Sequence, residues 1–195
     1  LEFKTWLSEL GGLNEAQEDG VSVSAEYETV LDKKSFSRWL KRLSKAPLFA
    51  FDTETTSIDA MRARIVGVSF AVKPGEGAYV PLAHDYLDAP SQLNREEVLE
   101  ALRPLLEDPD QEKVGQNLKY DCTVLSNHGI TLAGMRFDTM LESYVLDSTG
   151  SRHDMDTLAL KYLGHKTISF EEVAGKGKNQ LSFNEVPLED AGPYA

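Results

Sequence analysis

Residues 48–54 read Leu-Phe-Ala-Phe-Asp-Thr-Glu, an apolar run that ends in two acids one residue apart. Side chains alternate between the two faces of a strand, so a strand here turns Phe49 and Phe51 to one face. Asp52 and Glu54 would then share the other face. Two carboxylates at one spot repel each other unless one binds a proton or a divalent cation lies between them. The stretch therefore indicates a core strand with a metal site at its end, although 32 acidic residues in a chain of 195 also produce such a triplet by chance.

Composition limits the class of protein. A chain of 195 residues suits one well-buried domain, and 41% hydrophobic and 27% charged residues are typical of a soluble globular protein. No apolar run is long enough to span a bilayer, and residues 1–10 lack the pattern of a secretory signal. The single Cys122 has no partner for an internal disulfide. These features predict a protein of the reducing cytoplasm with no membrane partner.

The net charge of −12 bears on any nucleic-acid hypothesis, because proteins that bind many phosphates are usually basic. Two explanations are open. Either the protein never meets nucleic acid, or it holds a few nucleotides through metals while another domain supplies the basic groove.

The spacing of apolar and turn residues predicts an ordered set of strands and helices. Strands are expected over 27–31, 48–54, 64–72, 77–83, 113–115 and 135–137. Helices are expected after the capping residues Asp32, Asn94, Asn117 and Asp138, reaching about 43, 106, 128 and 146, and over 155–163 before Gly164. Short connections between the strands from 48 to 83 imply antiparallel pairing, and later strands alternate with helices. The sequence therefore predicts an α/β fold, a mixed sheet flanked by helices, with a linker over residues 1–25.

A third acid follows in residues 115–121, Gly-Gln-Asn-Leu-Lys-Tyr-Asp. If Asn117 caps a helix, Asp121 lies one turn in and on the same face. One interpretation is a capping acid that gains a few tenths of a kcal/mol up to ~1 kcal/mol from the helix dipole. The other is a third ligand at a strand-to-helix junction, which would complete a divalent-metal site with the acids of 48–54.

Other polar stretches have simpler interpretations. Asp138 and Asp154 are expected to cap helices rather than bind metal, and the four histidines show no ligand spacing. Residues 175–178, Gly-Lys-Gly-Lys, lack the spacing and hydroxyl residue of a phosphate-binding loop. They are either a solvated loop or a contact to a phosphate backbone.

Three stretches occur in the order of the motifs of the DEDD exonuclease superfamily, tyrosine subclass: Phe-Asp-Thr-Glu at 51–54, Asn-Leu-Lys-Tyr-Asp at 117–121, and Tyr194. Further stretches resemble, more narrowly, the 3′ to 5′ proofreading domain of bacterial DNA polymerase I; they are 79–81, 83–86, 137–144, 152–156 and 174–180. The resemblance runs from about Tyr27 to the last residue. It implies a ribonuclease-H-like fold, in which three antiparallel strands are followed by parallel strands.

The resemblance also implies roles for single residues. Asp52, Glu54, Asp121 and Tyr194 would be the catalytic set. The three acids would hold two divalent ions, Mg²⁺ or Mn²⁺ with Zn²⁺ as an option in one site, Asp52 bridging both and Asp121 holding the second. Tyr194 would orient the attacking water, because an unperturbed tyrosine pKa near ~10 disfavours a simple base. The residues expected to contact DNA are Ile58, Gln116, Asn117, Tyr120, Arg152 and Phe170.

Two of these contacts have an alternative. Ile58 and Phe170 would pack against terminal bases, as apolar and aromatic faces do for single strands, or they belong to the core. The family's third motif is Tyr-x-x-x-Asp, so its acid would fall beyond Ala195. Residues 26–195 are therefore expected to be an exonuclease domain truncated at its C-terminal end and weak or inactive alone, with residues 1–25 as an interdomain linker.

The implied function is proofreading by a DNA polymerase I. The domain would hydrolyse the terminal phosphodiester of single-stranded or frayed DNA to 5′-mononucleotides. Its partners would be the single-stranded 3′ end of DNA and the polymerase domain of the same parent chain, in the bacterial cytoplasm near the nucleoid. Two alternatives stay open: an RNA 3′ exonuclease resembling ribonuclease D, and a catalytically inactive scaffold module of a polymerase.

Overall fold

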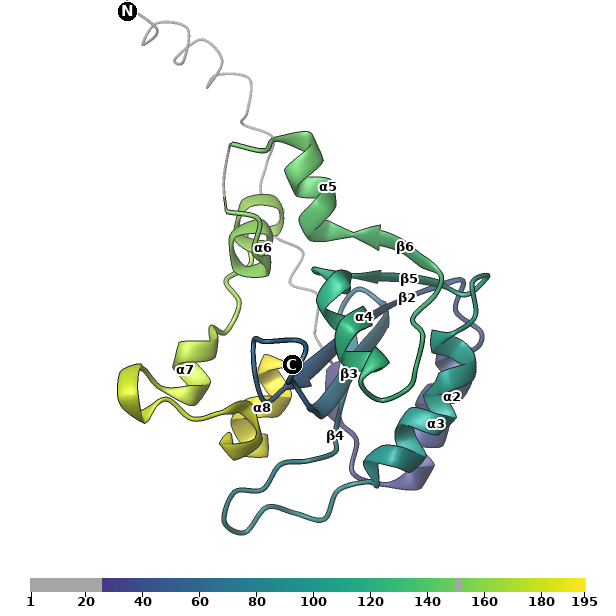
Figure 1. Cartoon of the computed structure of the whole chain (residues 1–195), viewed down its shortest axis with the longest axis vertical. Helices are drawn as coiled ribbons and strands as arrows, with labels where there is room; N and C mark the ends of the chain where they lie inside the picture. The colour runs from purple at the N-terminus through teal and green to yellow at the C-terminus, as the bar shows by residue number, and fades with distance from the viewer. Residues whose placement is uncertain (1–25, 150–151) are drawn as a thin grey trace, which may run out of the picture.

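One six-stranded sheet organises the computed structural model, which describes residues 26–149 and 152–195 (Figure 1). The linker expected over 1–25 lies outside the described residues. The strands are β1 (Glu26–Thr29), β2 (Leu48–Thr55), β3 (Ile65–Lys73), β4 (Glu76–Pro81), β5 (Glu112–Gly115) and β6 (Met135–Asp138). Their order across the sheet is β1-β4-β3-β2-β5-β6.

The pairing of the strands confirms the predicted fold class. β2, β3 and β4 are antiparallel neighbours, and β5 and β6 continue the sheet in parallel from β2. β1 adds a parallel pair with β4, which the sequence did not indicate.

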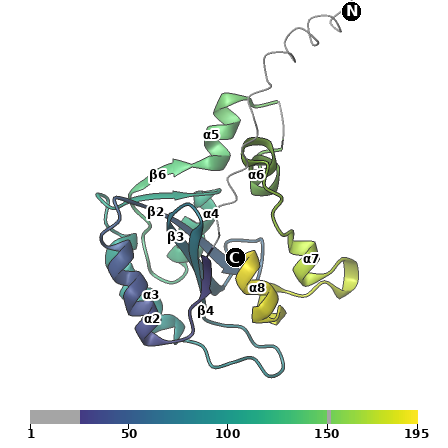
Figure 2. The ribbon, with the colours of Figure 1, turned by 180° about the vertical axis from the view of Figure 1, so that it is seen from behind.

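The helices are α2 (Lys33–Leu43), α3 (Arg95–Leu106), α4 (Leu118–Ser126), α5 (Thr139–Leu146), α6 (Met155–Leu163), α7 (Phe170–Ala174) and α8 (Leu188–Tyr194), with 3-10 turns at Gly177–Asn179 and Phe183–Glu185. Figure 2 shows α2 and α3 side by side, away from α6, α7 and α8. Among the described residues, no helix combines the length and apolar character needed to cross a bilayer.

Two hydrophobic cores lie on the two faces of the sheet. The larger one takes Phe49 and Phe51 of β2 together with apolar residues of α2, α3 and α4. The smaller one takes Val66 of β3 and Tyr79 of β4 together with residues of α7, α8 and the turn Phe183–Glu185. The predicted alternation along β2 is confirmed, and it leaves the two acids on the face of the smaller core.

Local capping starts most helices where the sequence predicts. The Asp32 carboxylate accepts from the N–H groups of residues 34 and 35, Asn94 caps α3, and Asp154 caps α6. Each satisfies N–H groups that a helix start leaves without a partner. Gly164 ends α6 with a φ of 62°, the left-handed conformation that glycine adopts without steric cost.

Asn117 is the N-cap residue of α4, as predicted, but its side chain does not do the capping. Asn117 has a φ of 60°, and its side chain makes no capping bond. Asp138 caps α4 instead, accepting from the N–H groups of Asn117 (3.1 Å) and Leu118 (2.8 Å). The reason is the parallel pairing of β5 and β6, which places Asp138 beside Gly115. Asp138 also caps its own helix α5, as predicted.

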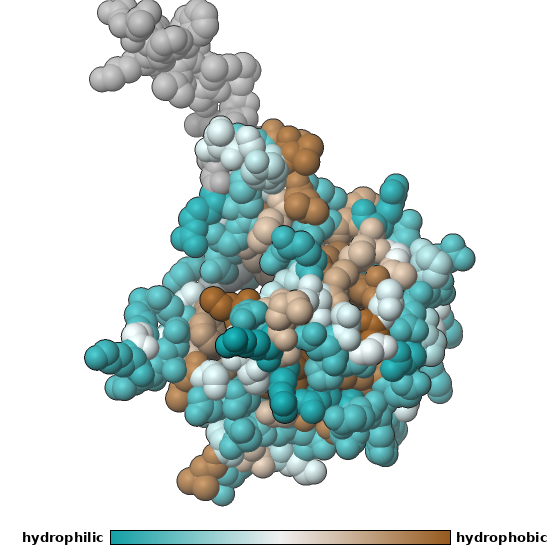
Figure 3. Space-filling view, viewed as in Figure 1, coloured by the Kyte–Doolittle hydropathy of each residue, from teal (hydrophilic) through white to brown (hydrophobic). Residues whose placement is uncertain are grey.

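The helices α5 and α6 add little to either core. α5 buries only Ser143 and α6 only Leu158, while several of their apolar side chains are exposed. The brown area over α5 in Figure 3 shows this apolar surface. Their positions therefore depend strongly on the caps at Asp138 and Asp154.

Candidate active site

Asp52 and Glu54 lie on the face of β2 that carries the smaller core. In the register with β3, Asp52 is opposite Ser69 and Glu54 is opposite Gly67. Asp52 lines a cavity of about 670 Å³. Burial, followed by the charges of neighbouring acids, raises the pKa of Asp52 well above its usual range, and burial and Asp121 raise the pKa of Glu54 to about 7. The proximity of acids that the sequence indicated therefore has an electrostatic consequence.

Asp121 reaches the same end of β2 from the helix α4. It shares the buried side of that helix with Leu118, Val124 and Leu125, because residues three and four apart lie on one face. Its Oδ1 accepts hydrogen bonds from the backbone N–H (3.1 Å) and the hydroxyl (2.6 Å) of Thr53. Burial raises its pKa to about 6 although both of these bonds lower it. The geometry thus joins Asp121 to β2.

The three acids have no cationic partner among the residues that the structure describes. No ion pair within residues 26–149 and 152–195 involves Asp52, Glu54 or Asp121. A divalent cation fits this donor set by charge, since it would stabilise buried carboxylates whose pKa values burial raises. Within the same ranges, however, no three ligating side chains are already arranged to hold a metal ion. Thr53 holds Asp121 through Oδ1 alone.

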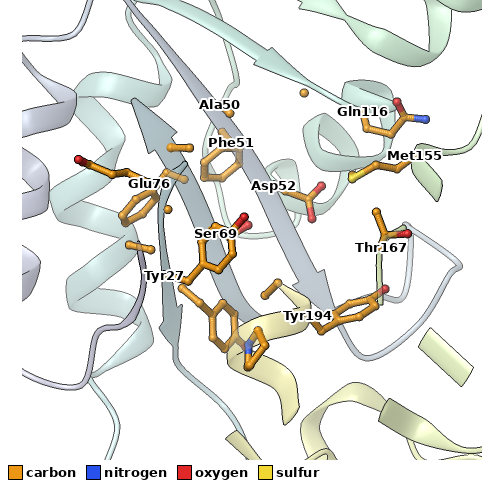
Figure 4. Close-up of a pocket in the computed structure, with 18 of the residues that line it drawn as sticks. Tyr27, Ala50, Phe51, Asp52, Ser69, Glu76, Gln116, Met155, Thr167 and Tyr194 are labelled. Atoms are coloured by element: carbon orange, nitrogen blue, oxygen red, sulfur yellow. The ribbon is translucent and has the colours of Figure 1, made fainter. Parts of the chain in front are cut away.

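Tyr194 comes from the C-terminal helix α8 and lines the same cavity as Asp52. Figure 4 shows the Asp52 carboxylate and the Tyr194 hydroxyl on one side of β2, with Gln116, Met155 and Thr167 around the space between them. Burial, then the charges of Glu54 and Asp52, raises the pKa of Tyr194 above its usual value. The hydroxyl therefore stays protonated at neutral pH and offers a proton donor and an acceptor lone pair.

Comparison with known proteins decides the family. Residues 27–195 match the family described as 3′-5′ exonuclease. DNA polymerase I of Pseudomonas aeruginosa is 60% identical, with the whole chain aligned, and DNA polymerase I of Rhizobium leguminosarum is 41% identical over 87% of the chain. This chain belongs to the 3′-5′ exonuclease domain family of bacterial DNA polymerase I. The exonuclease domain spans only 22% and 18% of those two relatives.

Solved structures share the fold of the exonuclease domain. The structure named as the POL domain of Pol1 from M. smegmatis, in complex with DNA primer-template and dNTP, has a TM-score of 0.59 at 23% identity, covering 72% of this chain and 23% of that one. The catalytic core of RRP6 from Trypanosoma brucei has a TM-score of 0.63 at 11% identity, covering 89% and 43%. Trypanosoma brucei RNase D has a TM-score of 0.58 at 18% identity, covering 74% and 50%. At these identities the likeness concerns the fold alone, so the relatives in sequence carry the family assignment.

Gln116 and Tyr120 lie close to the acids of the exonuclease domain, and the backbone N–H of Asn117 donates to Asp138. Gln116 lines the cavity and donates from Nε2 to the carbonyl oxygen of His153 at 2.7 Å. The Tyr120 hydroxyl donates to the carbonyl of Ser57. One N–H of the Gln116 amide is therefore already hydrogen-bonded within the protein. The Tyr120 hydroxyl holds the loop that follows β2. Their contacts to DNA stay a prediction.

The remaining expected contacts differ in exposure. Ile58 is 99% exposed in the loop between β2 and β3, so the alternative of core packing is wrong for it. Phe170 is partly buried and stacks on Phe183 with ring centroids 6.4 Å apart, so core packing describes at least one of its faces. Arg152 is exposed and pairs with Asp154 at 2.9 Å.

Sequence reasoning missed several residues of the site. Thr53, the partner of Asp121, was not predicted as part of the site. Ser69 could have been found from the antiparallel register, because it lies opposite Asp52. Met155 and Thr167 line the cavity from a helix start and an irregular segment, and no periodic pattern marks them.

Proposed function

We propose that this exonuclease domain removes nucleotides from the 3′ end of single-stranded or frayed DNA and proofreads within a DNA polymerase I. The observation that carries the proposal is the convergence of Asp52, Glu54 and Asp121, without cationic partners among the described residues, beside the cavity that holds Tyr194. Residues 26–195 would form the domain, and residues 1–25 the linker that joins it to its parent chain.

Asp52, Glu54 and Asp121 would hold two divalent ions, Mg²⁺ or Mn²⁺ with Zn²⁺ as an option in one site. When bound, such ions activate a water and stabilise the leaving 3′ oxygen during in-line displacement. The chain's own contribution is orientation. Thr53 would hold Asp121 beside the other two acids through Oδ1, and the protonated Tyr194 hydroxyl would orient the attacking water by hydrogen bonding.

The DNA would enter as a few terminal nucleotides. The exposed Ile58 and the partly buried Phe170 of α7 would pack against the terminal bases. The residues that would contact the terminal nucleotides are Gln116, Asn117 and Tyr120. Arg152 would exchange its partner Asp154 for a phosphate. The polymerase domain of the parent chain would supply the remaining DNA contacts, in the bacterial cytoplasm.

A paired substrate assay tests this function. Single-stranded DNA and RNA of one sequence, labelled at the 3′ end, are incubated with Mg²⁺ and two forms of the protein. One form is the chain itself, and the other is the chain continued past Ala195 with the sequence of the 60% identical relative. Release of labelled 5′-mononucleotides from DNA in preference to RNA is expected. Preference for RNA would favour the ribonuclease-D alternative, and failure to bind Mn²⁺ in both forms would favour the scaffold.

A further inference from the structure

His84 is a buried histidine that the proposed chemistry does not use. It follows β4, is 5% exposed, and places Nδ1 2.9 Å from the carbonyl oxygen of Val186 and Nε2 2.7 Å from the Tyr79 hydroxyl. A carbonyl oxygen only accepts hydrogen bonds, so Nδ1 carries the proton and Nε2 accepts from Tyr79. The imidazole therefore links β4 to a segment 102 residues away through a defined tautomer.

The backbone beside His84 is tied to the same segment. The Asp85 N–H donates to the Asn184 carbonyl at 2.9 Å, and the Asn184 side-chain amide donates back to the Asp85 carboxylate at 2.7 Å. The N–H of Leu188, the first residue of α8, donates to the Tyr86 hydroxyl at 3.2 Å. These bonds and the His84 imidazole bonds form the His84 seam, which fixes the start of the helix that carries Tyr194.

Phe183 connects the seam to the side chains of the proposed site. Its ring centroid lies 5.5 Å from the His84 ring and 6.3 Å from the Tyr79 ring. On its other sides it lies 5.5 Å from Tyr194 and 6.4 Å from Phe170. A displacement of His84 would therefore be transmitted by direct packing to both aromatic residues, because close-packed interiors transmit strain.

The Tyr79 ring packs over Gly67 of β3, the strand that pairs with β2. A Cβ on Gly67 would lie 2.2 Å from the Tyr79 hydroxyl, so the ring occupies the space that only glycine leaves. Gly67 pairs with Glu54 in the sheet. The Tyr79 hydroxyl thus has a fixed place next to the acidic end of β2, and His84 is the acceptor that satisfies it.

We propose that His84, acting through Tyr79 and Phe183, is a positioning residue that sets Tyr194 and Phe170 relative to the acids of β2. The inference rests on the proposed exonuclease function, because it assigns His84 no contact with DNA or metal. Its consequence is specific: loss of the Nε2 acceptor misplaces Tyr194 without altering the acids.

The test measures kcat, KM and Mn²⁺ affinity in the form of the protein that is active on 3′-labelled DNA. In His84→Asn the amide N–H can still donate to Val186, but the acceptor for Tyr79 is lost. We expect kcat to fall on the order of 10-fold, since small misplacements of a reacting group cost up to ~100-fold, with Mn²⁺ affinity unchanged. Tyr79→Phe should act in the same direction. Val98→Ala in the larger core is the matched control, and its kcat per folded molecule should be unchanged.

A double variant separates positioning from a general structural effect. If His84 acts on kcat through Tyr194, adding His84→Asn to Tyr194→Phe should lower kcat no further, because residues that act as a unit are not additive, and the effect through Phe170 should change only KM. A multiplicative loss, or an unchanged kcat in His84→Asn, would overturn the inference.

A second measurement separates this inference from the proposed function. Amide hydrogen exchange should speed up in α8 and not in β2 when His84 becomes Asn. If the unsubstituted protein degrades no DNA, the proposed function fails and exchange decides the structural part. Unchanged exchange in α8 would overturn it.

Discussion

At the scale of single residues, the molecule places like charges together where most proteins avoid them. Burial raises the pKa values of Asp52, Glu54 and Asp121, and neighbouring acids raise those of Asp52 and Glu54 further. Basic side chains of the described residues do not compensate these charges. Such a site lowers the stability of the metal-free fold, because desolvated like charges repel. A bound divalent cation would offset this loss of stability, because it neutralises the carboxylates.

Replacing Asp52 by Asn should therefore stabilise the metal-free protein. The neutral amide keeps the shape but removes one charge, so the free energy of unfolding in EDTA should rise on the order of 1 kcal/mol. Urea unfolding at pH 8 measures it. Asp110→Asn, an exposed acid, is the control and should have little effect. A destabilised Asp52→Asn protein would show that the carboxylate's interaction with the Thr53 backbone N–H outweighs its repulsion by the other acids.

His84 makes the stability of the fold depend on pH, because its pKa is lowered in the folded protein, whereas the pKa values of the acids are raised. Burial lowers its pKa below 6.5, outweighing the Val186 carbonyl and Asp85, which raise it. On acidification the unfolded chain therefore binds the proton first, and stability falls as the pH drops below about 6.5. The stability difference between the unsubstituted protein and His84→Asn should shrink between pH 7.5 and 5.5. Urea midpoints in EDTA measure it, and the acids contribute equally to both proteins.

At the scale of elements, caps and pairing decide where helices begin. Asp32, Asn94 and Asp154 were predictable because a cap and its N–H partners lie within three residues in the sequence. The role of Asp138 at α4 was not, because it depends on the parallel pairing of β5 and β6. The helix α7 was missed although Ser169 and Glu172 form a capping box at its start, and α8 gave no sequence signal. They have five and seven residues, and α8 begins after a proline and contains another.

Asp138→Ala should destabilise the domain more than a single-cap loss does. It removes acceptors from the starts of both α4 and α5, so about 1–3 kcal/mol is expected against about 1 kcal/mol for Asp154→Ala. Thermal or urea unfolding of the two variants side by side provides the comparison. Equal losses would mean that Asp138 contributes only one effective cap.

At the scale of the whole molecule, the two faces of the sheet differ: one stabilises the fold and the other carries the proposed site. One carries the larger core under α2, α3 and α4, and the other holds the acids and the smaller aromatic core. The sequence could predict the first face from apolar periodicity and the acids from strand alternation. It could not predict the hydrogen bond between Asp121 and Thr53 or the His84 seam, because both join segments distant in the chain.

The acidic balance predicts a weak dependence of DNA binding on salt. Lys73 and Lys166, which line the cavity, are already paired with acids, as are Arg152 and Lys176. The net charge is −12. Each phosphate neutralised on a single strand contributes about −0.7 to the slope of log K against log salt, so a slope no steeper than about −2 is expected. Fluorescence anisotropy with a labelled oligonucleotide measures it. A slope near about −5 would indicate a basic groove within this domain.

Metal-dependent hydrolysis at a 3′ end is the activity proposed for the acids of β2 and α4. Its sharpest test is the rate of mononucleotide release from 3′-labelled single-stranded DNA, with and without Mg²⁺, by the protein continued past Ala195 and by its Asp52→Ala variant. We expect release that requires Mg²⁺ and falls at least ~100-fold in the variant. Release that persists in EDTA, or an Asp52→Ala variant with the unsubstituted rate, would contradict the assignment of these acids.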